Sequence, residues 1–221
     1  PGRGYHGAEA GRDGHEDPFG IAITRRDGET HSVGTCDLLF PMQSISKVFT
    51  YALALEDHGR EHVLSRVGVE PSGDSYRSLV FDEREHRPHN PMVNAGALVA
   101  ADLVRGATVE EKLDRIVALM RRHAGHDRID VDRDVYRDEA SDADRNRGTV
   151  HLLRSEAMID GDPEEVLALY LQQCSVTVTC RDLSMMAATL ANGGVNPATG
   201  ERAFPLRYVR DVLSVMYTCG M

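Results

Sequence analysis

Tryptophan is absent from this sequence, and aromatic residues make up only 5% of its 221 residues. Lysine is almost absent as well: of the 25 basic residues, only Lys47 and Lys112 are lysines. A lysine side chain can lose its proton in a suitable site, whereas arginine effectively cannot. The scarcity of lysine therefore draws attention to each of these two positions as a place where chemistry could use a basic amine.

Long apolar runs and paired-cysteine motifs are also missing. The longest apolar stretches, such as residues 97–101, are far shorter than the roughly 20 residues of a membrane-spanning helix, so we expect no membrane insertion. The four cysteines, at positions 36, 174, 180 and 219, form no C-x-x-C motif, and no secretory signal is recognisable. Free thiols in a reducing cytoplasm explain this pattern most simply, so we expect a cytoplasmic protein.

The overall composition is that of a globular protein, with 41% apolar and 27% charged residues. Its length is enough for one large domain or two small subdomains around a sizeable core. The net charge of −10 repels phosphate backbones, so we expect no nucleic-acid partner. A small zwitterionic substrate is compatible with this charge, although most of the acidic residues are explained equally well as a solvated surface.

Hydrophobic periodicity predicts a β-hairpin followed by a largely helical region. Residues 1–17 show no periodicity and form a poorly defined lead-in. Residues 19–24 and 30–35 are predicted strands joined at the turn of Asp27 and Gly28. A helix is expected to begin near Ser44 and to stop at Gly59. Residues 127–147 are predicted as a charge-dense loop, and the further predicted helices are 94–105, 109–124, 163–173, 180–192 and 207–218.

Ser44 and Lys47 form an S-x-x-K motif at the predicted start of the first helix. A spacing of three residues places both side chains on one face of a helix. The positive potential of a helix N-terminus and desolvation both lower the pKa of a lysine. A neutral Lys47 could then accept the Ser44 proton as the serine attacks an amide carbonyl. Taken alone, the motif is equally typical of a helix-capping serine followed by a solvated lysine.

Metal and calcium sites are poorly supported, and we expect neither a metal nor another cofactor. His58 and His62 are four residues apart, but Gly59 lies between them and no glutamate follows the first histidine. Residues 130–141 place aspartates at alternate positions, as in a calcium loop. The glycine that such a loop requires is Val135 here, and its closing glutamate is Ser141, so this interpretation is rejected.

Seven ordered stretches of the chain resemble the glutaminase family, and together they cover the sequence from about residue 18 to its end. Any one of them would be weak evidence, but coincidence across the ordered set is negligible. The matching stretches are residues 42–49 (MQSISKVF), 67–73 (VGVEPSG), 88–97 (PHNPMVNAGA), Glu139 with Asn146, residues 170–175 (YLQQCS), 185–194 (MMAATLANGG), and 213–216 (LSVM) with 219–221 (CGM).

The resemblance implies an α/β (α+β) fold of the β-lactamase and transpeptidase type with an inserted helical subdomain. It also implies a glutaminase that hydrolyses L-glutamine to L-glutamate and ammonia through an acyl-enzyme, and a homo-oligomer. By position, Ser44 is the nucleophile, Lys47 its base, and Ser44 also contacts substrate. The other implied substrate-binding residues are Asn94, Glu139, Asn146 and Tyr170.

The chemistry of these residues agrees with that assignment, although each has a simpler interpretation. Glu139 can hold an α-ammonium group, while Asn94, Asn146 and Tyr170 can hydrogen-bond a carboxylate or orient an amide. Without the family context, Asn94 would be read as a helix cap, and Tyr170 as part of the core. Glu139 and Asn146 would be read as solvated loop residues.

The sequence departs from the family pattern at several points. It ends at Met221, before the tyrosine and the Lys-Ser-Gly strand that the family carries, so we expect a glutaminase domain over residues 18–221 that is incomplete at its C-terminus. Within it, residues 85–195 or so would form the helical subdomain, and C-terminal strands would be missing from the sheet. Only Tyr5 is available for an N-terminal family tyrosine. Tyr76 and Arg77 replace the usual Phe-Asn.

Two alternative functions share these features. The first is an inactive fragment or paralogue that only binds glutamate or glutamine. The second is a β-lactamase or DD-peptidase, which also uses S-x-x-K. Such an enzyme should carry a Ser-Asp-Asn or Tyr-x-Asn element and a Lys-Thr-Gly triad, and neither is present in this sequence.

Overall fold

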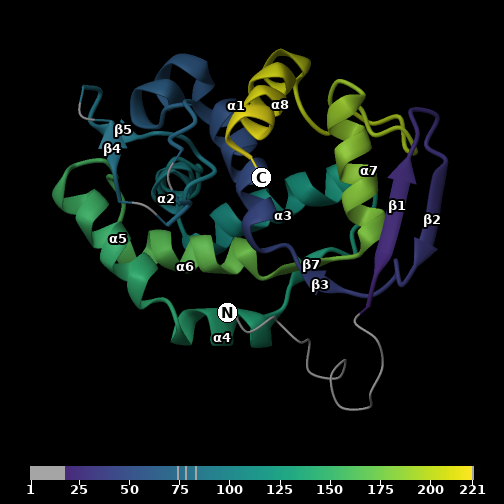
Figure 1. Ribbon diagram of the computed structural model, residues 1–221, viewed down its shortest axis with the longest axis horizontal. Helices are drawn as coiled ribbons and strands as arrows, with labels where there is room; N and C mark the ends of the chain where they lie inside the picture. Colours follow the sequence, from purple (N-terminus) through teal and green to yellow (C-terminus); the bar gives the residue numbers. More distant parts are fainter. Residues whose placement is uncertain (1–17, 74, 78, 83, 221) are drawn as a thin grey trace.

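The computed structural model describes residues 18–73, 75–77, 79–82 and 84–220 (Figure 1). The predicted lead-in at residues 1–17, including Tyr5, lies outside this part of the chain. The described part combines helices with short strands, so the predicted mixture of α and β structure is confirmed. Helices α1 (Lys47–Arg66) and α3 (Val109–Ala124) lie near the middle of the view, surrounded by the other elements.

The predicted β-hairpin is present at the N-terminal end of the described chain. Strands β1 (Gly20–Thr24) and β2 (Thr30–Gly34) are antiparallel, with Gly20 opposite Gly34 and Thr24 opposite Thr30. The turn contains Gly28 at φ 86°, a left-handed conformation that favours glycine. Among the described strands, β1 and β2 pair only with each other. Helix α7 (Cys180–Ala191) lies along β1, as Figure 1 shows.

The predicted helix near Ser44 begins with a 3₁₀ turn, η1 (Gln43–Ser46), that runs directly into α1. Gly59 does break the helical geometry, with φ 79° and ψ 166°, but the chain then resumes its helix and ends it at Arg66. The prediction that Gly59 stops the helix is therefore wrong in part. Glycine adopts this left-handed φ without a Cβ penalty, which lets the helix kink and continue.

The later predicted helices are confirmed to within three residues at each end. They are α2 (Asn94–Asp102), α3, α6 (Pro163–Cys174), α7 and α8 (Leu206–Cys219). Local signals set the bounds of α3: the Thr108 side chain accepts from the Glu111 N–H at one end, and Gly125 at φ 81° closes the other. No helix in the described ranges is both long enough and apolar enough to cross a bilayer.

The prediction of a loop over residues 127–147 is wrong. That stretch contains strand β6 (Asp130–Val131), helix α4 (Arg133–Ser141) and the start of helix α5 (Asp144–Ser155). The Asp132 carboxylate caps α4 by accepting hydrogen bonds from the N–H groups of Asp134 and Val135. Helix α4 buries none of its residues fully, and its many charged residues hid the helical spacing of Tyr136 and Ala140, which pack against the core.

A small antiparallel sheet supports the Ser44 segment. Strand β7 (Val176–Val178) lies between β3 (Phe40–Pro41) and β6, with Phe40 opposite Val178. The pairing continues one step beyond β3, because the Met42 N–H donates to the Val176 carbonyl at 2.8 Å. A second short pair, β4 (Phe81–Asp82) with β5 (Arg87–Pro88), lies near α2. The chain therefore reaches Ser44 directly from a hydrogen-bonded strand.

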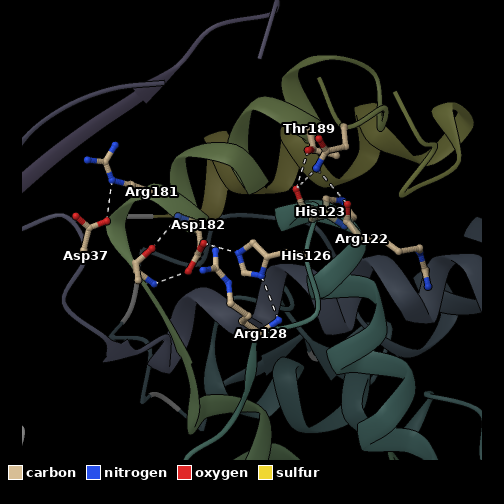
Figure 2. Close-up of polar contacts among 10 residues, drawn as sticks. Asp37, Arg122, His123, His126, Arg128, Arg181, Asp182 and Thr189 are labelled. Carbon is tan, nitrogen blue, oxygen red and sulfur yellow. Dashed lines mark hydrogen bonds and ion pairs between the residues drawn. The ribbon is translucent and has the colours of Figure 1, made fainter. Parts of the chain in front are cut away.

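Polar contacts join the end of α3 to α7 (Figure 2). The Thr189 hydroxyl donates to the His123 carbonyl at 2.8 Å, and His126 Nε2 lies 2.7 Å from Asp182 Oδ1. The His123 ring is fully buried and packs edge-on against Phe49, with ring centroids 5.2 Å apart. Burial lowers the pKa of His123 to about 4, so this histidine is a neutral core residue at physiological pH.

Candidate active site

Ser44 and Lys47 lie one turn apart where η1 meets α1. In a 3₁₀ helix, side chains three residues apart lie almost directly above one another, so the two side chains share a face. Ser44 is half-buried, and its hydroxyl makes no hydrogen bond to any other described residue. The geometry thus leaves the Ser44 hydroxyl available to a bound molecule, on the helix face that also carries Lys47.

The Lys47 side chain is buried, with 1% of its surface exposed. Its Nζ donates to the Met92 carbonyl and to Asn94 Oδ1, both at 2.8 Å. Desolvation lowers the pKa of Lys47 from 10.5 to about 8, although nearby Cys174 opposes this effect. A neutral amine has two N–H groups and one lone pair. Because both N–H groups are used by Met92 and Asn94, the lone pair remains free to accept a proton.

Asn94 and Asn146 extend this network. Asn94 opens α2, and its Nδ2 donates to Asn146 Oδ1 at 3.0 Å, while its Oδ1 accepts from Lys47. The helix-cap interpretation of Asn94 is wrong, since the residue before the helix is Val93 and no side chain caps it. Instead, Asn94 joins the base to the first turn of α5.

Glu139 lies in the last turn of α4 and Asn146 near the start of α5, so both occupy helices rather than a loop. One Glu139 carboxylate oxygen accepts a hydrogen bond from Gln43 Nε2 at 2.9 Å, which brings α4 against the residue preceding Ser44. The carboxylate is half-buried. It can therefore provide a negative charge at the edge of the site.

Tyr170 lies on α6 and has 4% of its surface exposed. It packs in the core, as its helical spacing suggested, and Cys174 follows it one turn further along the helix. Desolvation raises the pKa of Tyr170 well above its ordinary value, with smaller contributions from Cys174, Glu139 and Tyr76. Tyr170 therefore stays protonated and can act as a hydrogen-bond donor close to Glu139.

Gln43 is a site residue that the sequence analysis did not single out. It adopts φ 50°, which is uncommon for a residue with a side chain and costs on the order of 1 kcal/mol or more. Its carbonyl accepts from the Ser46 hydroxyl at 2.6 Å, while its amide reaches Glu139. Gln43 could have been identified from the sequence, because it lies next to Ser44 inside the matched stretch 42–49.

Tyr76 is a second residue near the site that was not among the predicted site residues. With Arg77, it replaces the Phe-Asn pair that is usual in the family. Its ring centroid lies 5.9 Å from Lys47 Nζ, and its carbonyl accepts from the Asn94 N–H at 2.9 Å. The guanidinium of Arg77 lies 5.3 Å from the same ring. The departure therefore lies beside the catalytic candidates rather than in a remote loop.

The structure thus gathers the predicted residues into two connected groups. Hydrogen bonds join Lys47, Asn94 and Asn146 into one chain. The Gln43–Glu139 hydrogen bond forms the second, with Tyr170 near enough for the Glu139 charge to raise its pKa, and Ser44 stands between Gln43 and Lys47 in the sequence. Among the described residues, no three His, Cys, Asp or Glu side chains are grouped so that they could hold a metal ion.

Known proteins match this chain over most of its length. The glutaminase family model matches residues 12–221. A glutaminase of Trichormus variabilis is 55% identical over 205 residues, which cover 93% of this chain and 61% of that protein. Glutaminase 2 of Clostridium perfringens is 43% identical, and the match covers 94% of this chain and 68% of that protein. The chain therefore spans about three fifths of the length of the first of these relatives.

Solved structures agree with the sequence comparison. A probable glutaminase from Bacillus subtilis superposes with a TM-score of 0.87 at 34% identity, covering 91% of this chain and 65% of that one. The protein Mglu in its glutamate form gives a TM-score of 0.87 at 43% identity, covering 95% of this chain and 48% of that one. The fold, the ordered sequence matches and the family model agree, and the chain belongs to the glutaminase family.

Proposed function

We propose that this protein hydrolyses L-glutamine to L-glutamate and ammonia, with Ser44 as nucleophile and Lys47 as its base. One observation carries the proposal: a buried lysine with a pKa of about 8 lies one 3₁₀ turn from a serine hydroxyl that has no partner among the described residues. Near neutral pH, part of the Lys47 population is neutral. Such an amine can activate a serine, as a desolvated base does in other acyl-transfer sites.

The proposed reaction proceeds through an acyl-enzyme. Ser44 Oγ attacks the side-chain carbonyl carbon of glutamine as its proton passes to Lys47 Nζ. The C–N bond then breaks, the Lys47 ammonium returns that proton to the leaving amine, and ammonia departs. Water next attacks the ester, with Lys47 again accepting a proton, and glutamate and free Ser44 are formed. The Ser44 N–H lies in the first helical turn, where N–H groups lack intrahelical acceptors, and can stabilise the oxyanion.

We propose that polar side chains of the site recognise the two charged α-groups of glutamine. The Glu139 carboxylate would pair with the α-ammonium group, exchanging its bond with Gln43 for one with the substrate. Asn94, Asn146 and the protonated Tyr170 hydroxyl would hydrogen-bond the α-carboxylate or the amide. Substrates without these groups would leave buried polar atoms unpaired and would therefore bind poorly.

We also propose a cytoplasmic location and a homo-oligomeric state for the protein. Its four cysteines are all free, which supports a reducing, cytoplasmic environment. A homo-oligomer is supported by the apolar side chains that α8 leaves exposed, among them Leu206 at 64% and Tyr217 at 91%. L-Glutamine is the proposed small-molecule substrate.

Ammonia release by the 221-residue chain tests the function directly. The chain would be incubated separately with L-glutamine, L-asparagine and a β-lactam, and released ammonia and β-lactam opening would be measured. We expect ammonia from glutamine at a rate well above that from asparagine, whose shorter side chain would place the carbonyl short of Ser44. Glutamate binding without any turnover would instead indicate a binding paralogue, and opening of the β-lactam would overturn the choice of substrate.

A further inference from the structure

Two cysteines that the proposed reaction does not use lie next to each other. Cys36 follows strand β2, and Cys180 is the first residue of α7. The two residues are far apart in sequence, but α7 packs on the β1–β2 hairpin that holds Cys36, and Cys36 is close enough to affect the pKa of the Cys180 thiol. Cys36 has 1% of its surface exposed, whereas Cys180 is partly exposed, so a reagent in solution can reach only the second thiol readily.

The surrounding contacts hold the two segments together. In Figure 2, Arg181 points toward Asp37, and its Nε lies 2.8 Å from Asp37 Oδ1, so the residues that follow the two cysteines are themselves paired. One turn further along α7, the Ser184 hydroxyl lies 2.8 Å from the Thr24 hydroxyl of β1. Residues four apart share a helix face, so Cys180 and Ser184 both face the hairpin.

The Cys36 thiol is also held in place by contacts with the hairpin. Its Sγ lies 3.2 Å from the Ile21 carbonyl and 3.1 Å from the Val33 carbonyl, one on each strand of the hairpin. A thiol has one hydrogen to donate, so its sulfur remains able to accept from Cys180. The Asp37–Arg181 ion pair and the packing of α7 on the hairpin hold the two cysteine-bearing segments side by side, which is the arrangement that a disulfide requires.

We propose that Cys36 and Cys180 form a reversible intrachain disulfide when the protein meets a low-molecular-weight disulfide oxidant such as oxidised glutathione. The Cys180 thiolate attacks one glutathione sulfur, the glutathione S–S bond breaks, and one glutathione thiolate leaves. The Cys36 thiolate then attacks Cys180 Sγ and releases the second glutathione. The two cysteines lose two electrons and two protons in total, and oxidised glutathione is reduced to two glutathione molecules.

The resting Cys180 thiol reacts slowly at neutral pH. Burial raises the pKa of Cys180 above its ordinary value, and the nearby Cys36 acts in the same direction. Little Cys180 thiolate is therefore present at neutral pH, so the reaction needs a higher pH or a longer exposure to the oxidant. The pair is suited to sustained oxidation rather than to rapid redox catalysis.

The bond would enclose the whole candidate site in one covalent ring. Every site residue, from Gln43 to Tyr170, lies between positions 36 and 180. The cysteines also flank the β3–β7 pair, at the end opposite to Ser44, since Phe40 pairs with Val178 and Met42 with Val176. Because a disulfide restricts the unfolded chain more when the ring is long, we expect oxidation to stabilise the fold that carries the site.

Oxidation of the full chain with oxidised glutathione tests this modification site. We expect two of the four free thiols to disappear, a loss of two hydrogens in intact mass, and a tryptic peptide pair joining Cys36 to Cys180. The oxidised protein should unfold at a Tm higher by about 5 °C or more, and reduction should reverse both changes.

Matched variants separate this bond from other thiol chemistry. Cys219→Ser should leave the crosslink and the Tm rise intact, whereas Cys180→Ser and, independently, Cys36→Ser should abolish both. The Tm of reduced Cys180→Ser and of reduced Cys36→Ser is measured first, to show that each variant folds. One folded variant is enough for the test. Only glutathione adducts on Cys180 or Cys219, or a disulfide between two copies of the chain, would overturn the proposal.

Discussion

Replacing Ser44 with alanine is expected to lower kcat/KM for glutamine by about a thousandfold or more, because the change removes the proposed nucleophile of the acyl intermediate. Binding of L-glutamate should be nearly unchanged, since Glu139, Asn94 and Tyr170 retain their contacts. Steady-state ammonia release and calorimetric titration with glutamate measure the two quantities. A large loss of glutamate affinity would show that Ser44 acts in binding rather than in chemistry.

Ser46→Ala is the matched control, because it removes the same hydroxyl two residues away. The Ser46 side chain is fully buried, and its hydroxyl donates to the Gln43 carbonyl at 2.6 Å, so it faces the protein rather than a substrate. We expect this variant to lose stability, by about 1 kcal/mol for one lost hydrogen bond, and to keep activity within about tenfold. Equal losses in both serine variants would contradict the assignment of Ser44.

The second large effect is expected for Lys47→Arg, which should lower kcat/KM by about a hundredfold or more because a guanidinium does not give up its proton. In the unmodified protein, the pKa of Lys47 is lowered to about 8 by burial. The amine is therefore protonated below that pH and neutral above it. Consequently kcat/KM for glutamine should rise with pH and level off above pH 8. In the Lys47→Arg variant this rise should be absent.

Lys112→Arg provides the control for the lysine exchange, because Lys112 is the only other lysine in the chain. It lies on α3, where its Nζ contacts the Asp102 carbonyl at 3.5 Å. Neither the rate nor its pH dependence should change in this variant. If kcat/KM of Lys47→Arg still rose with pH in the same way, the titration would belong to another group, and Lys47 would not be the base.

Helix bounds were predictable where short-range chemistry sets them. Thr108 and Gly125 delimit α3, and Asp162 followed by Pro163 opens α6, so both helices match their predicted starts. Helix α4 was missed because charged residues dominate its sequence, although Tyr136 and Ala140, four residues apart, pack against the core. The helical spacing of these half-buried residues was present in the sequence, but the density of charge in the stretch outweighed it in the prediction of a loop.

The residues of the candidate site were predictable from the sequence, but the hydrogen bonds that connect them were not. The ordered matches name Ser44, Lys47, Asn94, Glu139, Asn146 and Tyr170. They do not reveal that Asn94 bonds the Lys47 amine rather than capping its helix, or that Gln43 reaches Glu139 across 96 residues of sequence. Such contacts depend on how α2, α4 and α5 pack around η1, and this packing is a tertiary property.

Covalent labelling of the nucleophile tests the central claim most directly. A diazoketone analogue of glutamine loses nitrogen as it alkylates an active-site nucleophile, and mass spectrometry of the digested protein then locates the label. We predict one label per chain, on the peptide that contains Ser44, slowed by added L-glutamate and absent from Ser44→Ala. A label on another residue, or one that glutamate does not slow, would contradict Ser44 as the nucleophile of a glutamine-binding site.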